Sequence, residues 1–233
     1  MAFEFIVFDL DDTLYPRGSG VMEAIGDQIQ AWVRKELDLS RQEATELRRR
    51  YLRQYGTTMG GLMTEHGVDV GRYLSFVHDI PVEEYLEPNP ALARMLGQIP
   101  LRKVIYTNAT LEHGLRVLRA LRVTDQFERV IGIQEVGLRN KVSREAYERM
   151  LALLEAHPAG CIMVEDSPRN LRAAKALGMT TVLVDAHEDG GLGGADDHCI
   201  DFAVDTVLEV RLVVDELIGP TGVAPMTEMP HTG

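Results

Sequence analysis

The sequence predicts an α/β fold, a doubly wound parallel sheet with a helical segment inserted after the first strand. Short apolar segments alternate with helical patterns over most of the chain, which is typical of a parallel sheet covered by helices. The alternation is interrupted once, between Pro16 and Glu87, where several helical patterns occur and no strand pattern does. With 233 residues, 45% of them hydrophobic and 26% charged, the composition is that of a soluble globular protein.

The predicted strands are short runs bounded by turn or polar residues. Each is rich in valine, isoleucine or aromatic residues, as buried strands are. The segments are Phe3–Phe8, Lys103–Tyr106, Arg129–Ile133, Cys161–Val164 and Thr180–Val184, with a weaker sixth near Phe202–Val204. Their spacing leaves room for a helix between successive strands, so we expect them to form one parallel sheet.

Capping residues mark the ends of the helices between these strands. Thr110 and Ser143 each precede a helical pattern, in the position where a hydroxyl accepts a hydrogen bond from the first turn. Ser167-Pro168 places a capping residue before a proline at the first helical position, and Gly178 follows the end of the same pattern. These signals predict helices that cross over between parallel strands.

The inserted segment predicts a second, smaller domain. We expect residues 16–87 to form a helical cap, and residues 1–15 and 88–218 to form a Rossmann-like core. Ser40-Arg41-Gln42-Glu43 has the pattern of a capping box that opens a helix, and Glu87-Pro88-Asn89-Pro90 is the expected return linker. Residues 219–233 contain three prolines and three glycines and no lysine or arginine, which predicts a disordered tail.

Charge and composition restrict the possible partners. Lys and Arg total 24 and Asp and Glu total 36, a formal net charge of −12, which disfavours a nucleic-acid polymer or an anionic membrane as partner. Two cysteines are too few for a disulfide framework. No apolar run approaches the roughly 20 residues of a membrane span. The N-terminus has no basic segment typical of a signal peptide. We therefore expect a cytoplasmic protein.

Two carboxylates follow the first predicted strand. Asp9 and Asp11 are two residues apart, so in an extended chain they face the same side. Two ionised carboxylates at such a short distance repel each other, and the arrangement is tolerated when a cation lies between them or one of them is protonated. In parallel sheets, ligands bind at the carboxyl ends of the strands. The alternatives are an acidic turn without chemistry, or an EF-hand loop, which is excluded because Leu14 stands where that loop requires glycine.

Three further polar groups follow later strands. Thr107 and Asn108 are able to donate hydrogen bonds to a phosphate, or simply to cap a helix. Lys141 is either a partner for substrate charge or a solvated lysine. Glu165 and Asp166 supply the oxygen ligands that Mg²⁺ prefers, or complement a helix dipole. Because these groups occur in this order at successive strand ends, we expect them to form one site.

The pattern resembles that of the haloacid dehalogenase-like (HAD-like) superfamily. Asp9-x-Asp11-x-Thr13, Thr107, Lys141 and Glu165-Asp166 match its motifs in order, and the resemblance extends from Phe3 to about Leu217. It implies that Asp9 attacks phosphorus to form an aspartyl-phosphate, and that Asp11 acts as general acid and base. Thr107 would then bind the phosphoryl oxygens, and Lys141 would offset their charge.

The resemblance also implies a magnesium site. Mg²⁺ would bind the Asp9 carboxylate, the Asp11 backbone carbonyl and Asp166, with Glu165 bound directly or through water. Members of the superfamily that displace halide lack the second acid of the first motif. The presence of Asp11 therefore predicts a phosphatase or a mutase, not a dehalogenase.

Stretches outside the shared motifs are similar to pyrimidine 5′-nucleotidases. These are Phe8–Pro16, Tyr55–Leu62, Val77-His78-Asp79, and Glu165–Leu171 with Ala174–Met179. The similarity implies hydrolysis of a nucleoside 5′-monophosphate, UMP or CMP. The sequence departs from this pattern at Asn140-Lys141-Val142, where relatives carry prolines on both sides of the lysine. We expect this difference to free the loop around Lys141.

The cap is expected to close over the site and contact the leaving group. We expect nucleobase contacts from Gly56–Leu62, including Thr57 and Thr58; the alternative is a helix–helix turn without a substrate role. Arg17 is either a phosphate ligand or solvated. Alternative functions are phosphatase or mutase chemistry on another small phosphomonoester, such as a sugar phosphate or phosphoglycolate, and a non-catalytic phosphate-binding protein.

Overall fold

The computed structural model describes residues 2–184 and 197–219 and contains a six-stranded sheet. The strands are β1 (Phe5–Phe8), β2 (Arg102–Tyr106), β3 (Arg129–Ile131), β4 (Cys161–Glu165), β5 (Thr180–Val184) and β6 (Phe202–Val204). They lie in the order β3-β2-β1-β4-β5-β6, and every neighbouring pair is parallel. The predicted α/β class and parallel sheet are confirmed, and the weak sixth strand forms.

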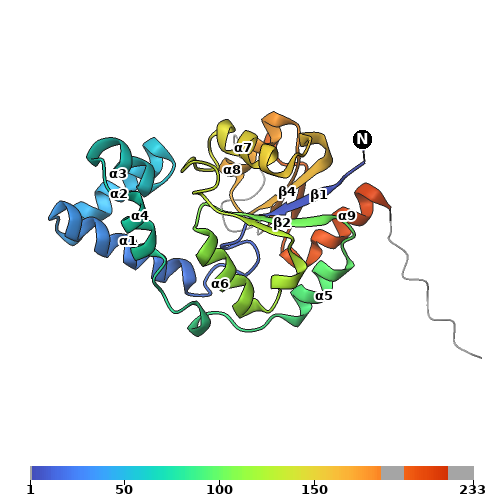
Figure 1. The fold of residues 1–233 in the computed structure, drawn as a ribbon, viewed down its shortest axis with the longest axis horizontal. Coiled ribbons are helices and arrows are strands. Elements are labelled where there is room, and N and C mark those ends of the chain that lie inside the picture. Colours follow the sequence, from blue (N-terminus) through green and yellow to red (C-terminus); the bar gives the residue numbers. More distant parts are fainter. Residues whose placement is uncertain (1, 185–196, 220–233) are drawn as a thin grey trace, which may run out of the picture.

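The helices lie on both faces of the sheet and in a separate group beside it (Figure 1). The bounds are α1 (Val21–Leu37), α2 (Arg41–Tyr55), α3 (Thr58–His66), α4 (Val70–Val77), α5 (Pro90–Gln98), α6 (Leu111–Leu121), α7 (Arg144–Leu154), α8 (Pro168–Leu177) and α9 (Val210–Ile218). Every described residue from 16 to 87 lies outside the sheet, as the sequence predicts.

Strand β1 is central because its alternate side chains enter two different apolar layers. Ile6 and Phe8 pack in the cluster that includes residues of α5, α6 and α9. Phe5 and Val7 pack in the cluster that includes residues of α7 and α8. All four side chains are fully buried. A strand apolar on both faces is what a doubly wound sheet requires, and it fixes the position of the residues that follow β1.

The helix termini mostly follow the predicted capping residues. The Thr110 hydroxyl accepts a hydrogen bond from His113 N at 3.1 Å, and the Ser143 hydroxyl accepts one from Ala146 N at 3.2 Å. The capping box of Ser40 at the start of α2 is present. Ser167 occupies the N-cap position of α8, but its side chain makes no capping hydrogen bond in the described structure. The prediction of a side-chain cap there is wrong, while that of Pro168 at the first position is confirmed.

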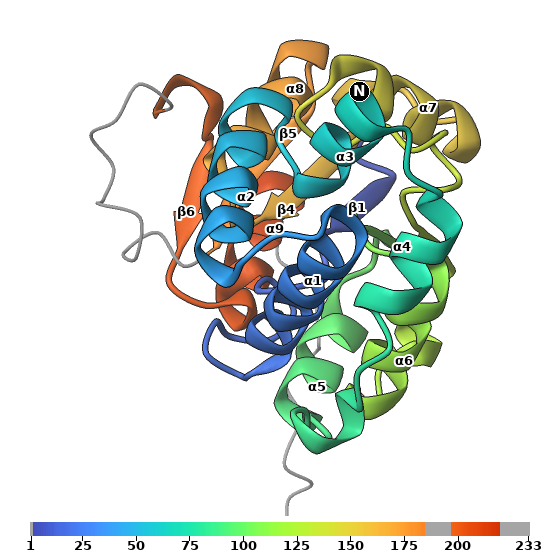
Figure 2. The same cartoon turned by 90° about the vertical axis from the view of Figure 1, so that its left-hand side faces the viewer.

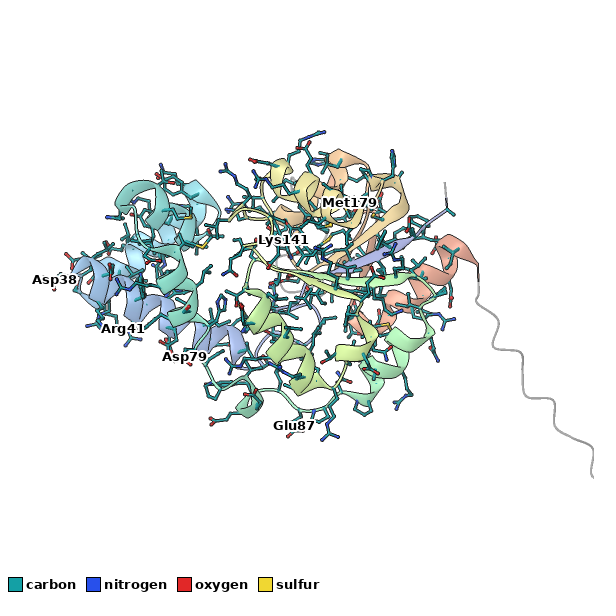
Figure 3. The ribbon with its side chains drawn as sticks, viewed as in Figure 1. Asp38, Arg41, Asp79, Glu87, Lys141 and Met179 are labelled. Carbon is teal, nitrogen blue, oxygen red and sulfur yellow. The ribbon has the colours of Figure 1, made fainter. Side chains whose placement is uncertain are left out.

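Helices α1 to α4, which we call the cap (Val21–Val77), pack around a third apolar cluster, which also includes Ile133 from the segment after β3. That cluster includes Trp32, Tyr51, Leu62 and Tyr73. Figure 2 shows the cap in front of the sheet, and Figure 3 shows Lys141 on the side of the core that faces the cap. Beyond Gly219, the predicted tail lies outside the described residues. In the described part of the chain, no helix has the length and apolar character needed to span a membrane.

Candidate active site

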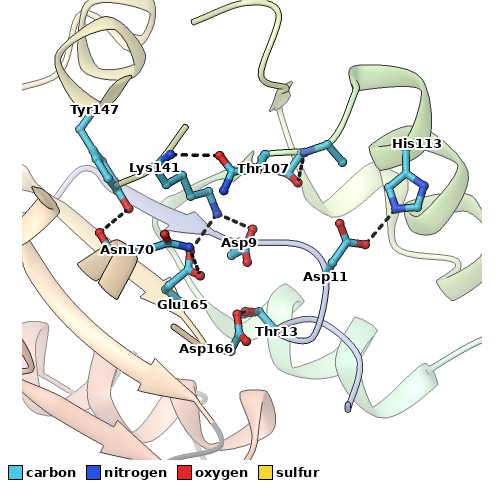
Figure 4. Close-up of polar contacts among 12 residues, drawn as sticks. Asp9, Asp11, Thr13, Thr107, His113, Lys141, Tyr147, Glu165, Asp166 and Asn170 are labelled. Atoms are coloured by element: carbon cyan, nitrogen blue, oxygen red, sulfur yellow. Dashed lines mark hydrogen bonds and ion pairs between the residues drawn. The ribbon is translucent and has the colours of Figure 1, made fainter. Parts of the chain in front are cut away.

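The predicted polar groups meet at the edge of the sheet that faces the cap. Strands β2, β1 and β4 are adjacent, so Thr107, Asp9 and Glu165 lie at three neighbouring strand ends. Asp11 follows Asp9 in the loop after β1, and Lys141 reaches the same place from the loop before α7 (Figure 4). Side chains as far apart in sequence as Asp9 and Glu165, which are 156 positions apart, therefore form one cluster.

Lys141 is the buried cation of this cluster, with 1% of its surface exposed. Its Nζ donates hydrogen bonds to Asp9 Oδ1 and, at 2.8 Å, to Glu165 Oε2. Burial alone lowers the pKa of a lysine, but the charges of Asp9 and Glu165 outweigh burial and raise the pKa of Lys141. The ammonium is therefore charged at neutral pH and offsets two buried carboxylates.

The carboxylates at the end of β4 have different partners. Glu165 Oε1 accepts a hydrogen bond from Asn170 Nδ2 at 2.9 Å, so both of its oxygens are engaged. Asp166 Oδ2 forms an ion pair with Arg17 Nη2 at 2.8 Å. Asp166 Oδ1 accepts a hydrogen bond from the Thr13 hydroxyl at 3.3 Å. The first motif of the sequence thus contacts the last directly.

Asp9, Glu165 and Asp166 form a cluster able to hold a metal ion. One oxygen from each lies within 4.8 Å of the others. Burial, and then repulsion from Glu165, raises the pKa of Asp9 well above its usual range. Burial also raises the pKa of Glu165, against the attraction of Lys141. The three carboxylates together carry more negative charge than Lys141 offsets. A set of oxygen ligands of this kind suits a hard divalent cation.

Asp11 is held by two residues that the sequence analysis did not identify. Its Oδ1 accepts hydrogen bonds from the Tyr15 hydroxyl at 2.5 Å and from His113 Nε2 at 2.9 Å. Burial favours a higher pKa for Asp11, but the charge and hydrogen bond of His113 and the hydrogen bond of Tyr15 outweigh burial and lower it. Burial raises the pKa of Tyr15, so its hydroxyl remains a donor.

A second histidine covers His113. The ring of His78, at the end of α4, lies 4.9 Å from the ring of His113 between centroids. Burial, followed by repulsion from His113, lowers the pKa of His78 to about 4. His78 is therefore neutral at pH 7. The neutral His78 ring therefore packs against His113 without repelling a positive charge on the His113 ring.

Thr107 and Asn108 occupy the end of β2. The Thr107 hydroxyl accepts a hydrogen bond from Ala109 N at 3.0 Å, which leaves its proton available to a ligand. Asn108 Oδ1 accepts a hydrogen bond from the backbone N of Lys141 at 3.0 Å. Asn108 thus helps to hold the loop that delivers Lys141, in addition to its predicted role as a donor to phosphate.

The loop around Lys141 is tied to the cap. Asn140 Nδ2 donates a hydrogen bond to Tyr55 O at 3.0 Å, and Asn140 Oδ1 accepts one from Val142 N at 3.3 Å. At Gly56, where φ is +82°, an added Cβ would lie 2.8 Å from Val142. Asn140 and Val142, where the sequence departs from the nucleotidase pattern, therefore lie against the cap. The hydrogen bonds of Asn140 restrain this loop in place of the prolines.

A cavity of about 430 Å³ lies between the cap and the strand ends. Its core side includes Asp9, Asp11, Thr107, Asn108 and Asp166. Its cap side is largely apolar, with Ile25, Ile29, Leu74 and Val77, and includes the polar residues Arg48, Thr57, Thr58 and Tyr73. The cavity is large enough for a small organic phosphate whose phosphoryl group lies at Asp9 and whose remainder contacts the cap.

The other predicted ligands differ in their placement. Thr57 and Thr58 both line the cavity, Thr57 in the turn between α2 and α3 and Thr58 at the first position of α3. The Thr57 hydroxyl also caps α3 by accepting from Gly60 N at 3.0 Å. The segment is thus both a helix–helix turn and a cavity wall. Arg17 pairs with Asp166 and is not among the described residues that line the cavity.

Comparison with known protein families places this geometry in context. The family described as haloacid dehalogenase-like hydrolase matches residues 3–178, about three quarters of the chain. The chain belongs to this family. The sequence-based assignment to the HAD-like superfamily is thereby confirmed, and the matched region contains the strand ends that carry Asp9, Thr107 and Glu165.

Individual relatives are more distant. Phosphate metabolism protein 8 of Saccharomyces cerevisiae is 25% identical over 191 residues, 76% of this chain and 60% of that protein. A glyceraldehyde 3-phosphate phosphatase of Methanopyrus kandleri is 28% identical over 233 residues, 91% of this chain and 97% of that protein. The solved structure of a HAD phosphatase from Thermococcus onnurineus superimposes on this chain with a TM-score of 0.60 and 22% sequence identity. The match covers 91% of this chain and 98% of that one, which shows a shared fold.

Family and site together define the class of reaction. HAD-like hydrolases share the first aspartate, and the second acid separates phosphate-transferring members from those that displace halide. Here Asp11 lines the same cavity as Asp9. The chain is a phosphoric monoester hydrolase.

Two site residues, His113 and Tyr15, are not indicated by any local pattern of the sequence. His113 is 102 positions from Asp11 and lies on a helix whose pattern indicates only an amphipathic crossover. Tyr15 is four positions from Asp11, and an aromatic residue after a strand has no pattern of its own. Because β2 lies beside β1, the start of α6, which follows β2, lies near the loop that carries Asp11. This strand order is the signal that would have indicated His113.

Proposed function

We propose that this HAD-like hydrolase is a Mg²⁺-dependent phosphatase of pyrimidine nucleoside 5′-monophosphates, releasing nucleoside and phosphate from UMP or CMP. The observation that carries the proposal is the largely apolar cap wall opposite Asp9. A flat base on a ribose would cover such a wall, whereas the phosphoryl group would remain at the charged strand ends.

The reaction follows from the positions of Asp9 and Asp11. A carboxylate oxygen of Asp9 attacks phosphorus, and the bond from phosphorus to the ester oxygen breaks as that oxygen takes a proton from Asp11. Asp11 then removes a proton from water, whose oxygen attacks phosphorus and releases Asp9 and phosphate. Lys141, in contact with Asp9, offsets the negative charge that accumulates there, and Thr107 donates its hydroxyl to the phosphoryl oxygens.

The acidic cluster suits the proposed metal. Asp9, Asp166 and the backbone carbonyl of Asp11 would hold Mg²⁺, which when bound neutralises charge between the anionic nucleophile and the anionic phosphate. Both oxygens of Glu165 already accept hydrogen bonds, which favours contact through water. The ion pair of Arg17 with Asp166 favours a role for Arg17 in orienting that ligand. Asp166→Asn should weaken the rise in melting temperature that Mg²⁺ produces.

A second candidate substrate is glyceraldehyde 3-phosphate. It is favoured by the similarity to glyceraldehyde 3-phosphate phosphatases of Methanopyrus kandleri and Methanocaldococcus jannaschii, each matched over 91% of this chain. A triose is much smaller than a nucleoside and would leave most of the cap wall without contact. The two substrates therefore make different demands on the cap side of the cavity.

Gly26 of α1 provides the test that separates them. It lines the cavity, and an added Cβ would have only Arg48 Nη2 within 4 Å, at 3.8 Å. Gly26→Leu should reduce the space for a base and lower kcat/KM for UMP and CMP by about tenfold or more, the effect of one unfavourable pocket contact. Hydrolysis of glyceraldehyde 3-phosphate should change little.

Ala31→Leu is the matched control, because Ala31 is exposed on the same helix and is not a cavity residue. It should leave both substrates unaffected. A wild-type preference for glyceraldehyde 3-phosphate over UMP and CMP would contradict the nucleotidase assignment and leave the phosphatase chemistry standing.

A further inference from the structure

Asp11 is held through one of its two oxygens. In the described structure, both Tyr15 and His113 donate to Oδ1, and Oδ2 carries no hydrogen bond. Figure 4 shows His113 on the side of Asp11 away from Asp9. The oxygen that remains for a ligand in the cavity is therefore Oδ2, and the two donors determine where it lies.

The burial of His113 is difficult to explain as packing alone. The residue is 1% exposed, and its Nδ1 is buried without a hydrogen-bond partner among the described residues. A buried polar atom without a partner lowers stability, and an apolar side chain of similar size would avoid that loss. The Nε2 contact with Asp11 is the interaction that distinguishes histidine from such a residue.

His113 is held both at its backbone and at its ring. Its backbone N is bound by the Thr110 hydroxyl at the start of α6. The ring of His78 covers it at 4.9 Å. His78 is itself held, because its Nδ1 contacts Leu74 O at 2.9 Å and its carbonyl accepts a hydrogen bond from Arg116 at 3.2 Å. Rotation of His113 away from Asp11 would therefore have to displace the end of α4.

We propose that His113 is a positioning residue that, together with Tyr15, holds Asp11 Oδ1 so that Oδ2 faces the leaving group. The inference rests on the proposed phosphatase function. As the bond from phosphorus to the ester oxygen breaks, the proton on Oδ2 moves to that oxygen. The carboxylate that remains is stabilised by the two hydrogen bonds to Oδ1. In the second step Oδ2 takes the proton from the water whose oxygen bonds to phosphorus.

Leaving groups that differ in their need for a proton provide the test. His113→Phe keeps a ring against His78 and removes the donor, whereas His113→Gln retains an N–H donor. On benzyl phosphate, whose alkoxide leaves poorly, His113→Phe should lower kcat/KM by about 10²-fold, the contribution of one general acid; kcat/KM reports release of the alcohol and not the later hydrolysis of the aspartyl-phosphate. On 4-nitrophenyl phosphate, whose phenolate leaves without protonation, kcat/KM should be nearly unchanged. His113→Gln should recover most of the loss.

Two further variants keep the outcome clear. Tyr15→Phe removes the other donor to Oδ1 and should give the same dependence on the leaving group, even if a His113 variant fails to fold. Val117→Ala, a buried truncation on the same helix, should affect both esters alike. Equal losses of kcat/KM on the two esters for His113→Phe and Tyr15→Phe would overturn the proposal. A folded wild type that hydrolyses neither ester would overturn the phosphatase function itself.

Discussion

At the residue scale, the arrangement of Lys141 between Asp9 and Glu165 dominates the site. Three charged groups are buried together, with the ammonium bonded to both carboxylates. Removing one member of a buried ion pair leaves an uncompensated charge, which destabilises a protein strongly. The contacts that hold Asp9 in the proposed nucleophilic position therefore also maintain the folded core at this edge of the sheet.

Lys141→Met should abolish activity and lower the free energy of unfolding at pH 7 by about 3–5 kcal/mol. The pKa of Asp9 and that of Glu165 are already raised, and without the ammonium both carboxyls favour protonation further. A carboxyl whose pKa is higher in the folded state than in the unfolded state, where it is near 4, stabilises the folded protein at low pH. This contribution to stability is lost as the pH rises through the folded-state pKa. The loss of stability should therefore shrink at pH 5 in urea unfolding experiments.

Lys103→Met is the control, because the Lys103 ammonium is bonded to backbone carbonyls of Ile99 and Leu101 and to no described carboxylate. Its effect on stability should not vary between pH 5 and pH 7. A Lys141→Met variant with the same pH-independent loss would contradict the account of the buried carboxylates.

Asp12 gives a second prediction about pH. Burial, followed by repulsion from Asp166, raises its pKa to about 6, above an unfolded value near 3.9. The folded state thus holds the proton more tightly, so stability falls as pH rises from about 4 to 6. In metal-free protein, Asp12→Asn should raise the free energy of unfolding at pH 7.5 by about 1 kcal/mol, after discounting for partial exposure. At pH 4 it should not.

Asn also suits left-handed backbone, and Asp12 has φ of +61°. Asp38→Asn controls for this effect, because Asp38 is exposed and has φ of +51°. An equal gain in both variants at pH 7.5 would show that backbone preference, and not removal of a buried charge, is responsible.

At the element scale, the strands and the site residues that follow them were predictable from local patterns. Apolar runs identified each strand, and the polar residues directly after them identified Asp9, Thr107 and Glu165 as neighbours at one sheet edge. Precise helix-start contacts were less predictable, as the missing side-chain cap at Ser167 shows. His113 was not predictable, because its role depends on how α6 lies against the loop after β1.

The glycines of α3 were expected to belong to a substrate-contacting turn, but one of them has a packing role. An added Cβ at Gly61 would lie 2.2 Å from Cγ of the buried Tyr51. Helix α3 thus packs directly on the Tyr51 ring of α2. A helix propensity argument alone would favour alanine at this position by about 1 kcal/mol, so packing and propensity act in opposite directions.

Gly61→Ala should therefore lower the free energy of unfolding by about 1–3 kcal/mol, because the ring has to move within a filled core. Gly97→Ala in α5 is the matched variant. Its added Cβ would lie 3.5 Å from the nearest atom, Gln126 Oε1, an ordinary contact, so it should stabilise by up to about 1 kcal/mol. Thermal unfolding of both variants checks the signs; stabilisation by Gly61→Ala would contradict this packing.

At the scale of the whole molecule, the insertion of a helical cap was predictable, but its contacts with the core were not. Asn140 Nδ2 donates to Tyr55 O at 3.0 Å, and Arg169 Nη1 donates to Leu52 O at 2.8 Å. Both acceptors lie at the end of α2, and each donor directly precedes a site residue, Lys141 or Asn170. No local pattern predicts a hydrogen bond to a distant backbone carbonyl.

Removing both contacts should favour an open arrangement of the cap. The double variant Asn140→Ala, Arg169→Ala loses two hydrogen bonds of about 0.5–1.5 kcal/mol each, so KM should rise about tenfold. Small-angle scattering should report a larger radius of gyration. Arg144→Ala, which breaks an exposed ion pair with Glu148 on the core, is the control and should change neither quantity.

The central claim is that Asp9 is the nucleophile of a phosphomonoester hydrolase. The most direct measurement is phosphate release with Mg²⁺ from UMP, CMP, AMP, glyceraldehyde 3-phosphate and 4-nitrophenyl phosphate, by the wild type and by Asp9→Asn. We expect the wild type to release phosphate, most rapidly from UMP and CMP, and Asp9→Asn to release none while remaining folded. Equal release by Asp9→Asn, or no release from any ester by the folded wild type, would contradict the claim.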